Sequence, residues 1–246
     1  MPFPTTQHRA DAYWAAFFGC TVEDLHVPRT VVVPHTALAG YAGVYLLRTE
    51  EACIVSAPAH LRAHTADRLG RLTPAQAFDA AVVTACFGLA VERVIGPAYQ
   101  GYADTAAFRP VDARGTRILN GRDTLALRHL AEACSEAEWE HSGIGKQDQQ
   151  TVFGCFAGGE LAAAGMGEPR DEALWHIGIV THPSYRGRGY GRAVVSAITS
   201  HGLELGRVPW YQTLDANTPS IAIAQSVGFT RYATTLAVRL RQAGGA

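Results

Sequence analysis

The sequence has no excess of charge of either sign. Its 246 residues include 21 Lys and Arg against 22 Asp and Glu, which gives a formal net charge of -1. A nucleic-acid-binding domain normally concentrates positive charge on one face, where it attracts the phosphate backbone. The composition therefore gives nucleic-acid binding no electrostatic support, and we expect no nucleic-acid partner.

Closely paired cysteines are absent as well. The five cysteines are widely spaced and contain no C-x-x-C pair: Cys20, Cys53, Cys86, Cys134 and Cys155. We expect buried, reduced thiols, because a disulfide framework or a cysteine metal site has a closer pattern. His60 and His64 lie four residues apart, a spacing that could hold a metal, but no third ligand is near. Two histidines on a solvated helix face are the better interpretation, and we expect no metal.

Long apolar runs are also missing. The longest, at 80–91, is interrupted by Thr84 and Gly88, and it is shorter than the ~20 residues that a membrane-spanning helix needs. The first ten residues lack the basic start and apolar core of a signal peptide. These absences predict a cytoplasmic protein with no membrane partner.

The composition that is present indicates a globular chain with two domains. Hydrophobic residues make up 48% and charged residues 17% of the chain, which excludes a disordered protein. Its length exceeds the ~100 to 150 residues of a usual domain. The stretch R-P-V-D-A-R-G at 109–115 breaks all periodicity. We therefore expect one domain at 1–112 and a second at 113–246.

The first half shows helix and strand patterns but no motif that can be attached to a reaction. Its expected elements are a helix over 9–18 ended by Gly19, strands from Thr30, Gly43 and Ala52, helices from Pro58 and over 73–88, a strand at 91–95 and a loop at 96–104. Thr73 and Gln76 predict a capping box at the start of the second of these later helices. The pattern is that of a small α/β domain.

The second half has clearer element signals. Its expected elements are a strand at 116–119, a helix from Asp123 or Thr124 to Ala133, a capping box at 135–138, a hairpin of strands 151–157 and 161–166, a strand at 174–180, a helix ended by Gly206, a strand at 210–215 and a helix from Thr218 to Gly228. The capping box gives Glu138 a structural role. The residues left after Gly228 suffice for one long strand but are few for a hairpin. A strand from the first half could take the place of the second strand of such a hairpin.

The stretch from Leu174 to Arg192 holds the chemistry that can be argued from residues. Alternation along the strand places His176, Gly178 and Val180 on one face. A glycine beside an imidazole leaves space where a ligand or a neighbouring backbone could approach. The strand leads directly into a glycine-rich turn and then into a helix.

The turn combines arginines and glycines at the start of that helix. Its residues are Arg186, Gly187, Arg188, Gly189, Tyr190, Gly191 and Arg192. A helix N-terminus presents unpaired N–H groups and a partial positive charge, and glycines let the backbone approach a phosphate closely. The turn therefore predicts a diphosphate site. No Lys-Ser or Lys-Thr follows, as a nucleotide P-loop requires, and the glycine spacing does not fit the dinucleotide fingerprint.

The pattern R-x-x-G-x-G, filled by Arg186, Gly189 and Gly191, resembles the GNAT acetyltransferase superfamily. Asn217 and Ser220, followed by Val-Gly-Phe at 227–229, are similar to the second signature of that family. The resemblance covers roughly residues 115–241. The alternative is that the glycines only form a tight turn, but a plain turn does not need three arginines at a helix N-terminus.

The resemblance implies a fold and a reaction. The expected fold class is α/β with an α+β mixed sheet, a GNAT fold in the second half and a first half that is a degenerate GNAT-like unit. The implied co-substrate is acetyl-CoA and the implied acceptor is a primary amine of a small molecule or peptide, while a homodimer stays open. The residues that the resemblance assigns to the cofactor are Ile179, Val180, Arg186, Gly187, Arg188, Gly189, Tyr190, Gly191, Arg192, Asn217 and Ser220.

The catalytic residues follow less directly. Ala224 stands where the family signature commonly has a tyrosine acid, so water, Tyr190 or Tyr211 would protonate the thiolate. His176 faces the ligand side of the strand, and its unperturbed pKa of about 6.5 suits a general base. Glu140 is the rival base. Either one could instead be structural, His176 as a hydrogen-bonded core histidine and Glu140 as a solvated carboxylate.

Three functions remain compatible with the sequence. The first is an N-acetyltransferase that uses acetyl-CoA. The second keeps the fold and uses a different acyl-CoA. The third is a CoA-binding module with weak or no turnover, which the missing tyrosine favours.

Overall fold

The computed structural model describes residues 5–241, and their contacts divide them into two compact units. Within these described residues, unit 1 comprises 5–100, 214–216 and 231–241, whereas unit 2 comprises 101–213 and 217–230. The backbone passes between the units more than once, so each unit contains residues from both halves of the sequence. The domain boundary expected between residues 112 and 113 stays a prediction.

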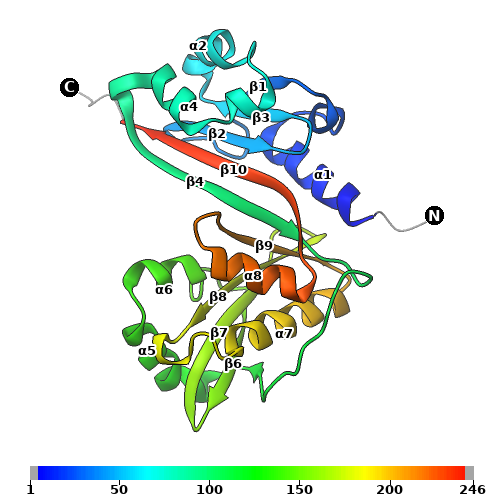
Figure 1. Ribbon diagram of the computed structural model, residues 1–246, viewed down its shortest axis with the longest axis vertical. Helices are drawn as coiled ribbons and strands as arrows, with labels where there is room; N and C mark the ends of the chain where they lie inside the picture. Colours follow the sequence, from blue (N-terminus) through cyan, green and yellow to red (C-terminus); the bar gives the residue numbers. More distant parts are fainter. Residues whose placement is uncertain (1–4, 242–246) are drawn as a thin grey trace. The chain divides into compact units, whose positions relative to one another are not determined.

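Unit 1 contains a mixed sheet with helices on both faces (Figure 1). Its main elements are α1 (Thr6–Phe18), β1 (Thr30–Pro34), β2 (Gly43–Arg48), β3 (Cys53–Ala57), α2 (Ala59–Leu69), α3 (Pro74–Ala77), α4 (Ala80–Phe87), β4 (Val91–Tyr102) and β10 (Thr230–Leu240). Its strand order is β1-β3-β2-β10-β4. β1 and β3 are parallel, and β2 is antiparallel to both of its neighbours.

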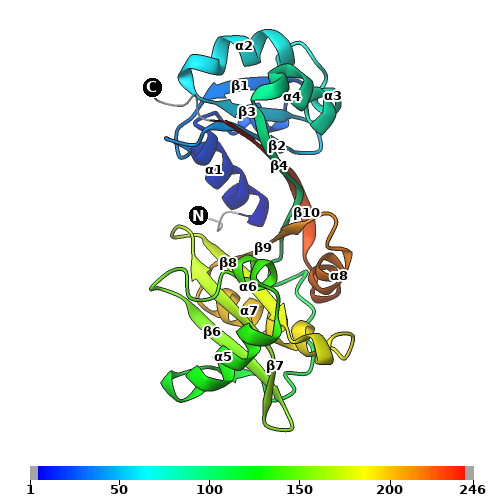
Figure 2. The same ribbon diagram turned by 90° about the vertical axis from the view of Figure 1, so that its left-hand side faces the viewer.

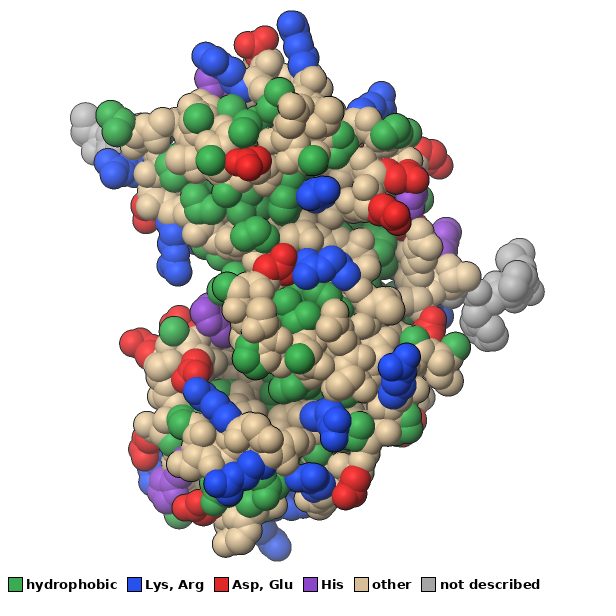
Figure 3. All heavy atoms as spheres, viewed as in Figure 1, with side chains coloured by type: hydrophobic (Ala, Val, Ile, Leu, Met, Phe, Trp, Pro, Cys, Tyr) green, Lys and Arg blue, Asp and Glu red, His purple; other side chains and the backbone are tan. Residues whose placement is uncertain are grey.

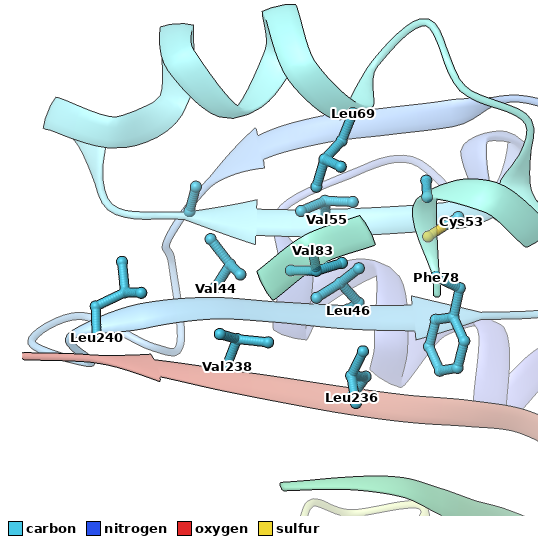
Figure 4. Close-up of a cluster of buried hydrophobic side chains, with 12 residues drawn as sticks. Val44, Leu46, Cys53, Val55, Leu69, Phe78, Val83, Leu236, Val238 and Leu240 are labelled. Atoms are coloured by element: carbon cyan, nitrogen blue, oxygen red, sulfur yellow. The ribbon is translucent and has the colours of Figure 1, made fainter. Parts of the chain in front are cut away.

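The core of unit 1 contains residues from early and from late in the sequence. Val44 and Leu46 of β2 lie in the same buried cluster as Leu236 and Val238 of β10, beneath α2 and α4 (Figure 4). Tyr45 points to the opposite face, where its ring contacts the aromatic rings of α1. Each fully buried aliphatic side chain contributes about 1.5–3 kcal/mol, so β10 is an integral part of this core.

Two expectations for the first half were wrong. The helix expected over 73–88 is divided into α3 and α4, because the Asp79 side chain accepts hydrogen bonds from the N–H groups of Ala81 and Val82 and caps a new helix. The capping box of Thr73 and Gln76 is confirmed. The loop expected at 96–104 is largely the second half of β4, because the sheet buries Ala98 to Tyr102 despite the Gly-Pro pair before them.

The strands of unit 2 follow one another in the order β9-β8-β7-β6-β5, with parallel and antiparallel pairs. Its main elements are β5 (Arg117–Ile118), α5 (Thr124–Ala133), α6 (Glu136–Ser142), β6 (Thr151–Ala157), β7 (Glu160–Pro169), β8 (Leu174–Thr181), α7 (Tyr190–Glu204), β9 (Val208–Leu214, of which Leu214 belongs to unit 1) and α8 (Thr218–Val227). The pairs β5–β6, β6–β7 and β7–β8 are antiparallel, whereas β8 and β9 are parallel. The expected hairpin and the expected mixed sheet are confirmed.

β8 separates two helical layers (Figure 2). On one face, Trp175 packs directly against Gly202 of α7. On the other face, Gly178 lies under the end of α6, and a Cβ atom at Gly178 would be 1.9 Å from the carbonyl oxygen of Ser142. The space that the glycine leaves is therefore filled by neighbouring backbone rather than by a ligand.

The pairing of β8 with β9 ends before either strand does. The parallel ladder stops at Ile177 and Tyr211, although β8 continues to Thr181. On the far side of β9, the N–H of Ala103 donates to the carbonyl of Pro209 at 3.3 Å, directly after the end of β4. The residue that follows β4 thus lies beside β9 within unit 2, and the expectation that a strand from the first half takes the place of a second strand after α8 stays a prediction.

Within residues 5–241, no helix is long and apolar enough to cross a membrane, and no group of three or more His, Cys, Asp or Glu side chains could hold a metal ion. All five cysteines are free, but only Cys53 and Cys155 are buried, so the expectation of burial is wrong for the other three. His60 is exposed, and Nε2 of His64 lies 3.0 Å from the carbonyl oxygen of Cys86.

Candidate active site

A cavity of about 1020 Å³ lies in unit 2, where the end of β8 meets the start of α7 and α8. Every residue that the sequence assigned to cofactor binding lines it. Its lining consists of Arg114, Glu138, His141, Ile179, Val180, Thr181, Tyr185, Arg186, Gly187, Arg188, Gly189, Tyr190, Gly191, Arg192, Asn217, Pro219, Ser220, Ala222, Ile223 and Ser226. The structure therefore brings residues from well-separated parts of the sequence to one hollow.

The start of α7 forms one wall of this cavity. Gly189 is the N-cap, with φ of 86°, and no side chain caps the first N–H groups of the helix. Such uncapped N–H groups are free to bind an anion, and the helix dipole favours negative charge at this position. Gly187 also has a positive φ, of 75°. Glycine is needed at both positions because other residues disfavour this backbone conformation.

The arginines of the turn have different surroundings. Arg186 donates to Glu138 Oε1 at 2.7 Å and to the carbonyl of Thr181 at 3.3 Å. The hydrogen bonds from Ser135, together with the charge of Arg186, hold the pKa of Glu138 below its ordinary value. The expected capping box of Glu138 is confirmed, so this carboxylate both caps α6 and pairs with a cavity arginine. Figure 3 shows basic and acidic side chains close together on one face of unit 2.

Arg114 is a further cavity residue that the sequence pattern did not single out. Its Nη1 donates to the carbonyl oxygen of Arg188 at 2.6 Å, and its guanidinium lies 3.6 Å from the position of a Cβ atom at Gly189. The backbone of Arg114 has φ of 46°, a conformation that costs free energy in a residue other than glycine. A cation beside a helix N-terminus is unfavourable unless an anion compensates both charges, so its placement favours an anionic ligand.

The start of α8 forms the opposite wall. The side-chain oxygen of Asn217 accepts a hydrogen bond from the N–H of Ser220 at 3.3 Å and so caps the helix. The NH₂ group of the same amide takes no part in this cap. The hydroxyl of Ser220 lies 2.8 Å from the hydroxyl of Tyr211, whose side chain is fully buried. Tyr211 thus does not line the cavity itself but is hydrogen-bonded to Ser220, which does. Ala224, by contrast, is completely buried in the helix packing and does not line the cavity.

The two residues predicted to be catalytic do not line the cavity. His176 lies three residues before Ile179 on β8, a distance of ~10 Å along a strand. Glu140 lies on an exposed part of α6, the helix that also contributes Glu138 and His141 to the lining. Because α6 packs on β8, both residues border the same face of the sheet.

His176 belongs to a polar cluster around the buried carboxylate of Glu168. Its Nδ1 lies 3.4 Å from Glu168 Oε1 and 3.2 Å from Arg170 Nη2. Its ring also packs against Trp210 of β9, with the centroids 5.0 Å apart. Burial lowers the pKa of His176 below its ordinary value, and the charge of Arg170 adds to this effect, while the hydrogen bond to Glu168 opposes it. The imidazole is therefore largely neutral near pH 7.

Glu168 is the centre of this cluster and was not predicted. Only 3% of the residue is exposed, and its carboxylate contacts Arg170 at 2.8 Å and Gln150 at 2.8 Å. Burial acts to raise its pKa, but the hydrogen bonds from His176 and Gln150 and the charge of Arg170 outweigh it and leave the pKa below its ordinary value. Its signal in the sequence was a carboxylate that follows the apolar run L-A-A-A-G-M-G inside β7.

Comparison with known proteins places this site in a family. Residues 124–229 match the model of the acetyltransferase (GNAT) family. The matched segment runs from α5 to Phe229 and contains both predicted signatures and most of the cavity lining. The chain therefore carries an acetyltransferase domain of the GNAT family.

Solved structures with a similar arrangement include acetyltransferases of this family. A GNAT-family acetyltransferase from Novosphingobium aromaticivorans is 25% identical over 62% of this chain and 67% of its own, with a TM-score of 0.48. One from Colwellia psychrerythraea is 19% identical over 65% of this chain and 60% of its own, with a TM-score of 0.48. An aminoglycoside N-acetyltransferase solved in complex with CoA is 21% identical over 48% of this chain and 92% of its own, with a TM-score of 0.39.

These TM-scores are all below 0.5, so the family assignment rests on the match of residues 124–229. No curated protein matches the chain.

Proposed function

We propose that the protein is an N-acetyltransferase that moves the acetyl group of acetyl-CoA to a primary amine of a small molecule or peptide. The observation that carries this proposal is the cavity lined by the uncapped N-terminus of α7, several arginines and the end of β8, which lies beyond the pairing of β8 with β9. Membership of the acetyltransferase family supports the same reaction class.

Each part of the cavity suits a part of acetyl-CoA. The N–H groups at Gly189 to Gly191 and the arginines beside them would hold the diphosphate. The gap where β8 leaves β9 exposes strand backbone that would bind the pantetheine arm, with the Asn217 amide as an additional donor. A main-chain N–H near Val180 would then donate to the thioester carbonyl oxygen, whose negative charge grows in the transition state.

An ammonium acceptor loses two protons on becoming an amide, one before the nitrogen attacks and one from the tetrahedral intermediate, and one proton must reach the sulfur. The amine nitrogen attacks the carbonyl carbon, the C–N bond forms, and the C–S bond breaks to release the thiolate of CoA. In this proposal His176 takes the ammonium proton through a chain of water molecules, because it lies outside the cavity lining, and Glu140 is the competing base. Water or the Tyr190 hydroxyl, which belongs to the cavity lining, protonates the thiolate, since Ala224 carries no acidic group and the Tyr211 hydroxyl is bonded to Ser220.

The first test is ligand-dependent stability. Acetyl-CoA at a hundredfold excess over its Kd should stabilise the folded chain by about 2.7 kcal/mol, because it binds only the folded state. A thermal melt should show this shift with acetyl-CoA and a much smaller one with ATP or NAD. Equal shifts with all three would reduce the cavity to a general anion site.

A matched pair of glycine variants locates the binding. Gly189→Val should abolish the selective shift, because a branched side chain blocks the approach of a phosphate and disfavours φ of 86°. Gly206→Val is the control, since Gly206 has a similar φ of 71° at the other end of α7 and open space around it. It should lower the melting temperature and keep the shift.

Turnover separates the enzyme from its alternatives. Release of free thiol from acetyl-CoA across a panel of amines would establish the acetyltransferase. Release only from longer acyl-CoA donors would establish a different acyl transfer. Binding without release from any donor would leave a CoA-binding module, the outcome that the missing tyrosine at position 224 favours.

A further inference from the structure

Glu168 is a buried carboxylate to which the proposed mechanism gives no role. Cross-strand pairing places it directly opposite His176, and its Oε1 lies 3.4 Å from the His176 Nδ1. Gln150 donates to the other oxygen, Oε2, at 2.8 Å. This bond fixes the orientation of the carboxylate and directs Oε1 toward the imidazole and Arg170.

Two opposite partners compete for the same nitrogen of His176. Arg170 Nη2 lies 3.2 Å from Nδ1 and can only donate a hydrogen bond, whereas the Glu168 carboxylate can only accept one. A neutral imidazole carries a single N–H. If Arg170 donates to Nδ1, the proton sits on Nε2, which then cannot act as a base. If Glu168 accepts from Nδ1–H, Nε2 has a free lone pair.

We propose that Glu168 is a positioning residue that holds the proton of His176 on Nδ1 and so makes Nε2 the atom that deprotonates the acceptor amine. The inference rests on the proposed function, because it assumes that His176 is the base. Arg170 is drawn away from the imidazole by its own contact with Glu168, which at 2.8 Å is shorter than its 3.2 Å contact with Nδ1. Such charge-assisted hydrogen bonds are stronger than neutral ones.

Glu168 and Arg170 also act on His176 after it has taken the proton. When Nε2 takes the amine proton, His176 becomes an imidazolium with Nδ1–H still on Glu168. The carboxylate stabilises that positive charge, and Arg170 opposes it. Among the described residues, the charged groups in contact with His176 are Glu168 near the end of β7 and Arg170 just after it, while Trp210 contributes an uncharged ring from β9. Burial lowers the pKa of the His176 imidazole, and the two charged groups shift this pKa in opposite directions.

The experiment compares Glu168→Gln, Arg170→Gln and His176→Gln in the full chain. Glu168→Gln should lower kcat at least about tenfold with little change in the acetyl-CoA melting shift, and the acidic limb of its kcat–pH profile should move to lower pH. Arg170→Gln should move the limb to higher pH. Opposite shifts are the signature of a tuned base, because a general loss of structure would not reverse their sign.

A second measurement does not depend on turnover. The ¹⁵N shifts of the His176 ring, assigned by difference from His176→Gln, should show the Nδ1–H tautomer in the natural sequence and the Nε2–H tautomer in Glu168→Gln. In the His176→Gln background, Glu168→Gln should cause no further loss of kcat, because a positioning residue acts only through the group it positions.

Several outcomes would overturn the inference. The Nε2–H tautomer in the natural sequence is one, and an unchanged acidic limb in Glu168→Gln is another. A greater loss in Glu168→Gln than in His176→Gln, with the limb retained in the latter, would make Glu168 the base. If the natural sequence binds acetyl-CoA but releases no thiol with any amine, the proposed function fails on that result, while the tautomer measurement still decides how Glu168 acts on His176.

Discussion

At the scale of single residues, the cavity is defined by charges that are costly without a ligand. Arg114 has a disfavoured backbone conformation and lies beside the start of α7. Its guanidinium donates a hydrogen bond to the backbone carbonyl oxygen of Arg188. The positive end of the helix dipole and several guanidinium groups meet there. A bound anion relieves this repulsion further than Glu138 does, so Arg114 should contribute to affinity although it lies outside the family signature.

Arg114→Ala should weaken acetyl-CoA binding about 10- to 100-fold, since a hydrogen bond to a charged group contributes about 1.5–3 kcal/mol. Titration calorimetry at low and moderate salt measures the change, and the difference should shrink as salt screens the charge. Arg122→Ala is the control, because Arg122 is exposed and does not line the cavity. Identical Kd values for the Arg114 variant and the natural sequence would remove this residue from the site.

At the scale of elements, α8 shows why an acid cannot simply be restored. The helix lines the cavity through Ser220, Ala222 and Ile223, whereas Ala224 is fully buried on its inner side. The N–H of Phe229 donates to the carbonyl of Ala224 at 3.0 Å, which ties the following turn to this position. A larger side chain at 224 would therefore meet protein rather than the sulfur of a ligand.

Ala224→Tyr should destabilise the fold by about 1–3 kcal/mol or more, because extra atoms in a packed interior force neighbours out of place. It should not raise turnover. Ala222→Tyr, on the exposed cavity side of the same helix, should change the free energy of unfolding by less than about 0.5 kcal/mol. Denaturant melts of both variants give the comparison. A stable Ala224→Tyr with faster thiol release would show that this position faces the sulfur after all.

At the scale of the whole molecule, the first and last strands of the chain share one core. β10 is antiparallel to β2, pairing Leu236 with Leu46 and Val238 with Val44. Leu236, Val238 and Leu240 are each at most 7% exposed, within a cluster otherwise formed by residues before position 92 (Figure 4). The predicted second domain, 113–246, thus contains a strand whose apolar face is covered by the predicted first domain.

A chain restricted to residues 113–246 should accordingly be unstable or aggregate, because it exposes the apolar face of β10 and an unpaired strand edge. Its yield, circular dichroism and melting temperature are compared with those of the full chain. Co-expression with 1–112 is the control and should restore a soluble complex. A monomeric 113–246 with a cooperative melt like that of the full chain would show that β10 does not need its partners in unit 1.

The sequence by itself determined the local features of the protein. Periodicity, caps and turn residues predicted α6, the β6–β7 hairpin, β8 and the turn into α7, because these depend on residues a few positions apart. The spacing of Arg186, Gly189 and Gly191 identified the family, and the residues assigned to the cofactor all line one cavity. A tight turn into a helix requires glycines and capping residues at fixed positions, so it can be predicted from the local sequence.

Only the tertiary structure decided what depends on distant residues. β4 continues through Gly96 and Pro97 because the sheet supplies partners that the local pattern cannot show. Arg114 reaches Gly189 from a loop without periodicity. Glu168 meets His176 because an antiparallel register places them opposite each other. Register, burial and the charge around a titrating group are properties of the packed chain, so the environment of the proposed base could be described only from the fold.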